Sequence, residues 1–156
     1  MTTLDIVGLC GSLRAASLNR MALDLAGESM PAGMRLTAVE WREIPVFDAD
    51  ALAAGLPAPV AALQERIRRA DGVLIATPEY NFSIPGGLKN AIDWVSRGDN
   101  QPFAGKPVAI VTASPGGVGG ARVQYDLRKV MLFLNAMVLI KPEVFIAGVK
   151  RMLAPN

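Results

Sequence analysis

The chain has 156 residues, of which 51% are hydrophobic and 19% are charged, so it is long and apolar enough for one domain with a single core. Its net charge of +2 is too small to predict binding to nucleic acid or to a membrane surface. Histidine is absent, which argues against His-based hydrolysis and most zinc chemistry.

No apolar run reaches the roughly 18 residues of a membrane span, and the N-terminus lacks the pattern of a signal peptide. The lone Cys10 cannot form an internal disulfide, which fits a reducing compartment. We therefore expect a cytoplasmic protein with one domain over residues 1–156, without nucleic-acid or membrane partners.

Short apolar runs typical of buried strands alternate along the chain with segments of helical periodicity. The expected strands are Leu4–Leu9, Met34–Trp41, Val73–Thr77, Lys106–Thr112 and Val138–Ala147, with Pro142 indicating an edge position or a bend in the last. Helices are expected after Ser17, which is placed to cap the first, and over Val60–Ala70, Leu88–Val95 and Tyr125–Ala136. Ile44–Pro59 is rich in Ala, Pro and Asp and is expected to be a surface loop.

Continuous apolar strands that alternate with helices predict a parallel sheet covered on both faces, a doubly wound three-layer sandwich of five strands. The last strand of such a fold is normally followed by a helix that covers one face, but the sequence stops soon after Ala147. We expect this C-terminal helix to be missing through truncation, rather than another subunit to cover that face.

In a sheet with the flavodoxin-like strand order 2-1-3-4-5, ligands bind beyond the carboxyl ends of the strands. Three polar or glycine-rich segments follow strands there. They are CGSLRAASLN, TPEYNFSIPGG and ASPGGVGG, and they are expected to meet at one edge.

The first of these segments has the donors of a phosphate site. The start of a helix exposes about four N–H groups and a partial positive charge. Ser12, Arg14, Ser17 and Asn19 add side-chain donors around that point. The alternative is ordinary capping by Ser17 with solvated arginines. Neither the dinucleotide pattern G-x-G-x-x-G nor a Walker loop is present, which favours a terminal phosphate monoester.

The other two segments suit a flat ligand. Tyr80 can flank a planar ring and Asn81 can address its edge, although a simple turn is an equal reading. Gly116, Gly117, Gly119 and Gly120 permit positive φ and close approach of a ring to the backbone. A phosphate at one end and a flat heterocycle at the other describe flavin mononucleotide (FMN).

Three stretches carry a resemblance to a known family, namely GSLRAASLNR, TPEYNFSIPGGLKNAIDW and SPGGVGGARVQYDLR. In this order they resemble the NADPH-dependent FMN reductase family of flavodoxin-like proteins, and its chromate/quinone reductase branch most closely. The resemblance implies phosphate contacts from Ser12, Arg14, Ser17 and Asn19, and ring contacts from Pro78, Glu79, Tyr80, Asn81, Phe82, Ser114 and Gly117.

The resemblance also implies FMN as cofactor, NADPH or NADH as co-substrate, and a small quinone-like electron acceptor, with chromate, azo compounds or free flavin as further acceptors. The flavin carries the chemistry, so we name no catalytic side chain and no metal ligand. Lys89 and Arg97 can attract an anionic substrate or remain solvated. The alternative function is a flavodoxin-type electron carrier, which the net charge of +2 disfavours because such carriers are generally acidic.

Apolar helix surface beyond what one sheet face needs indicates a subunit interface, expected around Trp94, Met131, Leu132, Phe133 and Met137. The resemblance implies a homodimer or homotetramer. Arg122, Tyr125 and Glu143 are hypothesised to form a polar network between subunits.

Overall fold

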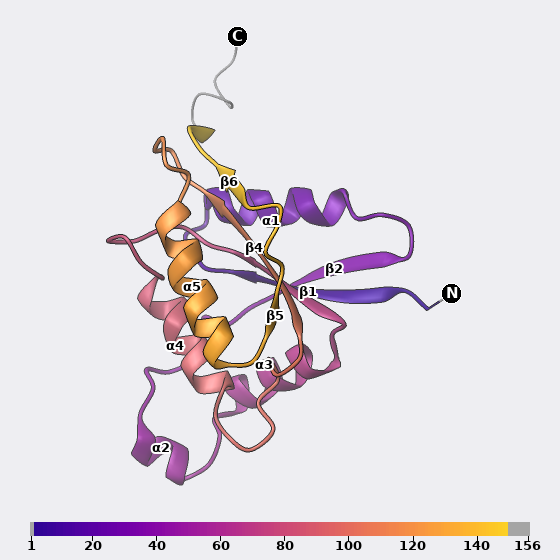
Figure 1. Cartoon of the computed structure of the whole chain (residues 1–156). Helices are drawn as coiled ribbons and strands as arrows, with labels where there is room; N and C mark the ends of the chain where they lie inside the picture. Colours follow the sequence, from indigo (N-terminus) through magenta and orange to yellow (C-terminus); the bar gives the residue numbers. More distant parts are fainter. Residues whose placement is uncertain (1, 150–156) are drawn as a thin grey trace.

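The strands of the chain form one parallel sheet in the order β2-β1-β3-β4-β5, as the sequence predicts (Figure 1). This computed structural model describes residues 2–149. The strands are β1 (Leu4–Cys10), β2 (Met34–Val39), β3 (Gly72–Ala76), β4 (Pro107–Ala113), β5 (Met137–Val138) and β6 (Val144–Ile146).

The last expected strand is in two pieces, which corrects the prediction of one strand over Val138–Ala147. β5 pairs with the start of β4, β6 pairs with its end, and residues 139–143 leave the sheet between them. Pro142 lies in this interruption, where its missing N–H breaks no ladder hydrogen bond. The edge position and bend expected from Pro142 are therefore confirmed.

The helices are α1 (Leu18–Glu28), α2 (Ala49–Ala53), α3 (Ala58–Arg69), α4 (Gly86–Val95) and α5 (Ala121–Phe133). The short α2 was not predicted, since the sequence indicated a loop over residues 44–59. The Asp48 carboxylate caps α2 by accepting from the Asp50 N–H at 2.8 Å, a local signal within that Asp-rich stretch. None of the helices in residues 2–149 combines the length and apolarity needed to span a bilayer.

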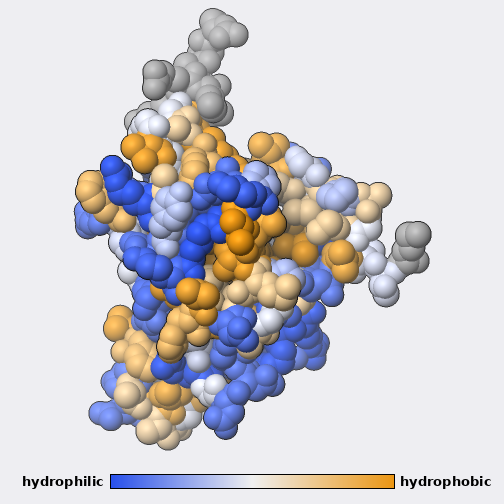
Figure 2. Space-filling model, in the orientation of Figure 1, coloured by the Kyte–Doolittle hydropathy of each residue, from blue (hydrophilic) through white to orange (hydrophobic). Residues whose placement is uncertain are grey.

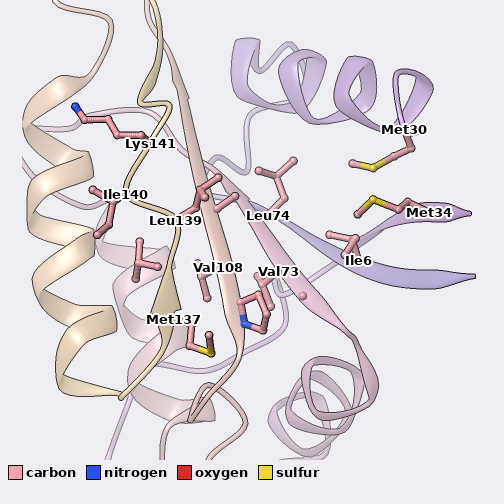
Figure 3. Close-up of a pocket in the computed structure, with 14 residues that line it drawn as sticks. Ile6, Met30, Met34, Val73, Leu74, Val108, Met137, Leu139, Ile140 and Lys141 are labelled. Atoms are coloured by element: carbon pink, nitrogen blue, oxygen red, sulfur yellow. The ribbon is translucent and has the colours of Figure 1, made fainter. Parts of the chain in front are cut away.

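The two faces of the sheet are covered unequally. α3, α4 and α5 lie on one face over the larger hydrophobic core, whereas α1 lies alone on the other over a small cluster of Cys10, Leu23, Ala76 and Val111 (Figure 1). Beside α1 the sheet carries an apolar cavity of about 670 Å³. Ile6, Leu74, Met30 and Met34 line one side of it and Leu139 and Ile140 the other (Figure 3).

An ion-pair network joins α3 to the sheet. The Arg66 guanidinium donates to both carboxylate oxygens of Asp5, at 2.6 and 3.2 Å, and Arg35 lies 3.5 Å from the same carboxylate. The Arg66 hydrogen bond lowers the pKa of Asp5, against the opposing effect of burial. Arg66 therefore differs from Arg68 and Arg69, which pair with Glu65 on the exposed face that the sequence predicts.

We expect Asp5→Asn to lower the free energy of unfolding at pH 7 by about 1 kcal/mol, because a half-buried ion pair is lost. Since the pKa of Asp5 is lower in the folded chain than in the unfolded one, its contribution is present at neutral pH and lost as the pH falls through the folded-state value. Urea unfolding from pH 7 to pH 3 measures the difference. A gap between the two proteins that stays constant over this range would contradict the assignment.

Candidate functional site

The segments that follow β1, β3 and β4 meet at one edge of the sheet, joined by hydrogen bonds. The Gly11 N–H donates to the Ala76 carbonyl at 2.7 Å, and the Thr77 N–H donates to the Val111 carbonyl at 3.1 Å. A Cβ on residue 11 would lie 2.2 Å from Thr77 Oγ1, so only glycine allows this approach. The predicted convergence of the three segments is confirmed.

The start of α1 offers hydrogen-bond donors at this edge. Ser17 is the N-cap, and its Oγ accepts from the Arg20 N–H at 3.2 Å. Within residues 2–149, the N–H groups of Leu18 and Asn19 have no hydrogen-bond acceptor, and no carboxylate lies within ion-pair distance of Arg14. Ser12 is half-buried beside them, with its Oγ accepting from the Arg14 N–H at 3.3 Å and its proton free to donate.

The Asn19 side chain is engaged inside the protein. Its amide nitrogen donates to the Ala113 carbonyl at 2.9 Å and its oxygen accepts from the Ala113 N–H at 2.8 Å. The residue is 2% exposed. The side chain therefore fixes α1 to the end of β4, and only the Asn19 backbone N–H is left to face a ligand.

The segment after β3 contains a tight turn in a costly conformation. Tyr80 and Ser83 exchange two backbone hydrogen bonds of 3.1 and 3.0 Å, while Asn81 and Phe82 have φ of 50° and 67°. Two consecutive left-handed residues without glycine cost roughly 1–2 kcal/mol each, and such strain concentrates at functional sites. The turn presents Tyr80 and Phe82 to solvent, 52% and 66% exposed.

Glu79 anchors this turn to the start of α5. Its carboxylate accepts from the N–H groups of Arg122 and Val123, at 3.0 and 3.2 Å, and from the Arg122 guanidinium at 3.1 Å. The helix is preceded by Gly120, which has no capping side chain, so Glu79 supplies the missing acceptor and complements the helix dipole. The Arg122 guanidinium also lies over the Phe82 ring, 4.1 Å from its centroid.

A second contact holds the turn from its other end. Ser83 Oγ donates to the Asp126 carboxylate at 2.7 Å, and Lys129 pairs with the same carboxylate at 2.6 Å. Lys129, and then Ser83, lower the pKa of Asp126. Sequence reasoning missed both Asp126 and the role of Arg122 at this site, because partners some 40 residues apart leave no local pattern.

The glycine-rich segment after β4 has two kinds of glycine. Gly119 and Gly120 have φ of 64° and 78°, and a Cβ there would lie 3.0–3.2 Å from Phe145, Ala147 or Thr112. Gly116 and Gly117, where the sequence also permits a positive φ, do not adopt one. Gly117 is exposed with open space at its Cβ position, and Ser114 Oγ accepts from the Gly116 N–H at 3.1 Å.

The two cations considered for anionic substrates are engaged locally. Lys89 pairs with the Asp93 carboxylate at 2.7 Å, and Arg97 donates to the Asp93 carbonyl at 2.8 Å. The Arg97 guanidinium also lies 5.6 Å from the centroid of the Phe47 ring. Both side chains are thus held by contacts with the nearby Asp93.

The residues at the edge fit an FMN molecule. Free N–H groups at the start of α1, with Ser12 and Arg14, provide donors for a phosphate monoester, and each charge-assisted hydrogen bond contributes about 1.5–3 kcal/mol. The turn at residues 80–83 places aromatic side chains beside the same edge, and Gly117 leaves open space on the side of β4. The fold and this site define a flavin-binding α/β protein of the flavodoxin-like class.

The sequence profile of one family, NADPH-dependent FMN reductase, matches residues 4–150, and the chain belongs to this family. A quinone reductase of Escherichia coli (strain K12) is 55% identical over 148 residues, which cover 94% of this chain and 78% of that protein. The NAD(P)H-dependent FMN reductase PA1204 of Pseudomonas aeruginosa is 48% identical over 145 residues, covering 93% of this chain and 78% of that protein.

Among solved structures, FerB from Paracoccus denitrificans, a flavoenzyme NAD(P)H:(acceptor) oxidoreductase, superposes with a TM-score of 0.86 at 34% identity. The match covers 92% of this chain and 79% of that one. An FMN-dependent NADH-azoreductase from Bacillus anthracis in complex with FMN, at 15% identity and a TM-score of 0.66, shares the fold. The comparisons confirm the family, the FMN cofactor and the NAD(P)H oxidoreductase class expected from the sequence, and they favour that class over the electron carrier.

We expect Asn19→Ala to lower the free energy of unfolding of the FMN-free protein by about 2–3 kcal/mol, because two buried backbone groups of Ala113 lose their partner. Urea unfolding without FMN measures this loss. Leu25→Ala, at an exposed position of the same helix, is the control and should change stability little. An Asn19→Ala protein that loses affinity for FMN while its FMN-free stability is unchanged would show that the side chain serves the ligand instead.

We expect Glu79→Gln to lower the free energy of unfolding by about 1–2 kcal/mol, since the start of α5 loses a charged acceptor for two N–H groups. Arg122→Met removes only the guanidinium partner and should cost less. The two single variants and the double variant form a thermodynamic cycle in urea unfolding. Equal losses for both single variants would mean that the ion pair, and not the helix cap, carries the stabilisation.

Proposed function

We propose that this chain, as a single flavodoxin-like domain, uses FMN to pass electrons from NADPH or NADH to quinones. The observation that carries the proposal is the pair of N–H groups without acceptors at the start of α1. At the same edge of the sheet lies the strained turn of residues 80–83 with its two exposed aromatic side chains. The names of the relatives support a quinone as acceptor. One of them is a quinone reductase that is 55% identical over 94% of this chain. Chromate, azo compounds and free flavin stay predicted acceptors.

FMN, when bound, supplies the redox chemistry, because its ring accepts hydride and passes electrons on in steps of one or two. The chain supplies binding and orientation. In this proposal Ser12, Arg14 and the N–H groups of Leu18 and Asn19 hold the phosphate, and the buried Ser17 fixes the start of the helix.

In this proposal the other two segments would hold the isoalloxazine ring. Tyr80, Asn81 and Phe82, with the backbone of Pro78 and Glu79, would lie on one side, and Ser114 and Gly117 on the other. Glu79 acts through its carboxylate as a positioning residue, since all its contacts are with α5. Nicotinamide and acceptor would react with the ring in turn, and no side chain would need to transfer a proton.

The proposal is tested by anaerobic titration of the FMN-loaded protein with NADPH, followed by absorbance near the flavin band. We expect the band to bleach within the time of mixing, and to return when a soluble benzoquinone is added. A protein that binds FMN but is not bleached by NADPH or by NADH would be an electron carrier, which would contradict the proposed activity.

A reducing, cytoplasmic location is part of the same proposal. The support is Cys10, which is buried, lacks a partner cysteine anywhere in the sequence, and lies 3.4 Å from the Ser12 carbonyl and 3.9 Å from Ser17 Oγ.

We also propose that the chain forms a homodimer or homotetramer through α5 and the β5–β6 segment. Leu132, Phe133, Met137 and Ile140 are each at least 64% exposed there. A groove of about 550 Å³ separates the helix from the segment, and Arg128 Nε is buried in this region without a partner among residues 2–149. Figure 2 shows apolar groups exposed among polar ones on this side of the molecule.

Two of the residues expected at the interface do not lie on the surface, and this corrects the prediction. Trp94 and Met131 are 0% exposed, and the Trp94 indole N–H donates to the Pro45 carbonyl at 2.9 Å. The polar network between subunits stays a prediction. Within this chain Arg122 pairs with Glu79, and Lys141, with a smaller effect from Tyr125, lowers the pKa of Glu143.

We expect Phe133→Glu to reduce the molar mass measured by light scattering to that of a smaller assembly, because a charge replaces an 84% exposed aromatic side chain in the apolar surface. Leu25→Glu, at a 60% exposed position of α1, is the control and should leave the mass unchanged. An unchanged mass for Phe133→Glu would place the interface elsewhere.

A further inference from the structure

A polar cavity lies at the carboxyl end of β2, next to the first segment but on its side away from β3. Its volume is about 270 Å³, and its walls include Ser12, Arg14, Arg20, Glu40, Trp41 and Arg42. Because β2 pairs with β1 in parallel, this cavity opens at the same edge of the sheet as the start of α1.

The cavity has an excess of positive charge. Three of its walls are guanidinium groups and one is a carboxylate, that of Glu40. Arg20 pairs with Glu40 at 3.0 Å and with Asp24 at 3.3 Å, so its charge is already balanced. In the part of the chain that the structure describes, neither Arg14 nor Arg42 has a carboxylate within ion-pair distance.

The arginine at the rim is held in place by its surroundings. The Arg42 guanidinium donates to the Leu13 carbonyl at 2.7 Å, which ties the end of β2 to the first segment. The neighbouring Trp41 indole N–H donates to the Cys10 carbonyl at 2.8 Å, and the indole packs so closely on Gly87 that a Cβ there would lie 2.9 Å away. Arg42 retains further N–H donors for an anion, since guanidinium carries five.

Another cavity adjoins the arginine-lined one and shares several of its lining residues. Its volume is about 520 Å³, and it shares Val39, Glu40, Trp41 and Arg42 with the arginine-lined cavity. Pro59, Ala62 and Leu63 add apolar groups to its lining, and Glu43 and Arg66 add charged ones. The arginine-lined cavity thus adjoins a partly apolar space that is large enough for a purine.

We propose that Arg42 binds the 2′-phosphate of NADPH, with the adenine in the adjoining, partly apolar cavity. The inference rests on the proposed function and adds the basis on which NADPH is preferred to NADH. A phosphate monoester on ribose is the feature that separates the two nucleotides. A guanidinium group at the same edge of the sheet as the flavin site suits such a monoester. The Glu40 carboxylate lies in the wall of the same cavity, where its charge opposes the binding of an anion.

Steady-state kinetics with both nucleotides test the assignment. Arg42→Met should raise KM for NADPH at least about tenfold and leave KM for NADH within about twofold, because one charge-assisted hydrogen bond is lost. Glu40→Gln should lower KM for NADPH by about two- to fivefold, since the opposing charge is removed. Arg35→Met, which removes a positive charge at the opposite end of β2, is the control and should change neither value.

Binding of adenosine 2′,5′-bisphosphate to the FMN-loaded protein tests the site without catalysis. Calorimetry should show that it binds more tightly than adenosine 5′-monophosphate, and that Arg42→Met removes the difference. Equal affinity for the two probes, or a preference that survives Arg42→Met, would overturn the inference.

The FMN affinity of Arg42→Met shows whether Arg42 binds the flavin phosphate instead of the 2′-phosphate of NADPH. A large loss of FMN, with unchanged discrimination between the two probes, would assign Arg42 to the flavin phosphate and overturn the inference. If instead neither nucleotide bleaches the flavin while the bisphosphate still binds, the proposed function fails and the anion site stands.

Discussion

The start of α1 is held at a fixed place on the sheet, and the rest of the site depends on that position. The two hydrogen bonds between Asn19 and Ala113 fix the helix to the end of β4, while Gly11 packs against Thr77 at the end of β3. A helix terminus is a useful anion site only if its N–H groups point to a defined spot that water does not fill better. Because α1 lies alone on its face of the sheet over a small core, these polar contacts are important for fixing its position.

The aromatic side of the site depends on a comparable arrangement around α5. Glu79 and Ser83 hold the two ends of the turn through Arg122, Val123 and Asp126, and the left-handed Asn81 and Phe82 lie between these anchors. A turn that costs free energy persists only where its surroundings define it, and here charged contacts at both ends do so. The parallel strand order puts the start of α1 and this turn at the same edge of the sheet.

The sequence predicts the layers, the strand order and the edge at which the segments meet, because periodicity and βα alternation are local signals with few topological solutions. It does not predict that the Asn19 and Glu79 side chains serve the fold, since their partners Ala113 and Arg122 lie far along the chain. A polar residue in such a motif can either bind the ligand or hold the fold in place, and only the distances in the structure distinguish the two roles. The same limit applies to Trp94 and Met131, whose apolar character fits an interface and a core equally well.

A comparison of FMN with riboflavin tests most directly whether the donors at the start of α1 hold the cofactor. The two molecules share the ring and differ in the phosphate, so their affinities isolate the contribution of Ser12, Arg14 and the free N–H groups of Leu18 and Asn19. Fluorescence titration of the FMN-free protein should give an affinity for FMN at least about 100-fold higher than for riboflavin. Equal affinity for the two would mean that the ring alone is recognised, and it would contradict the account.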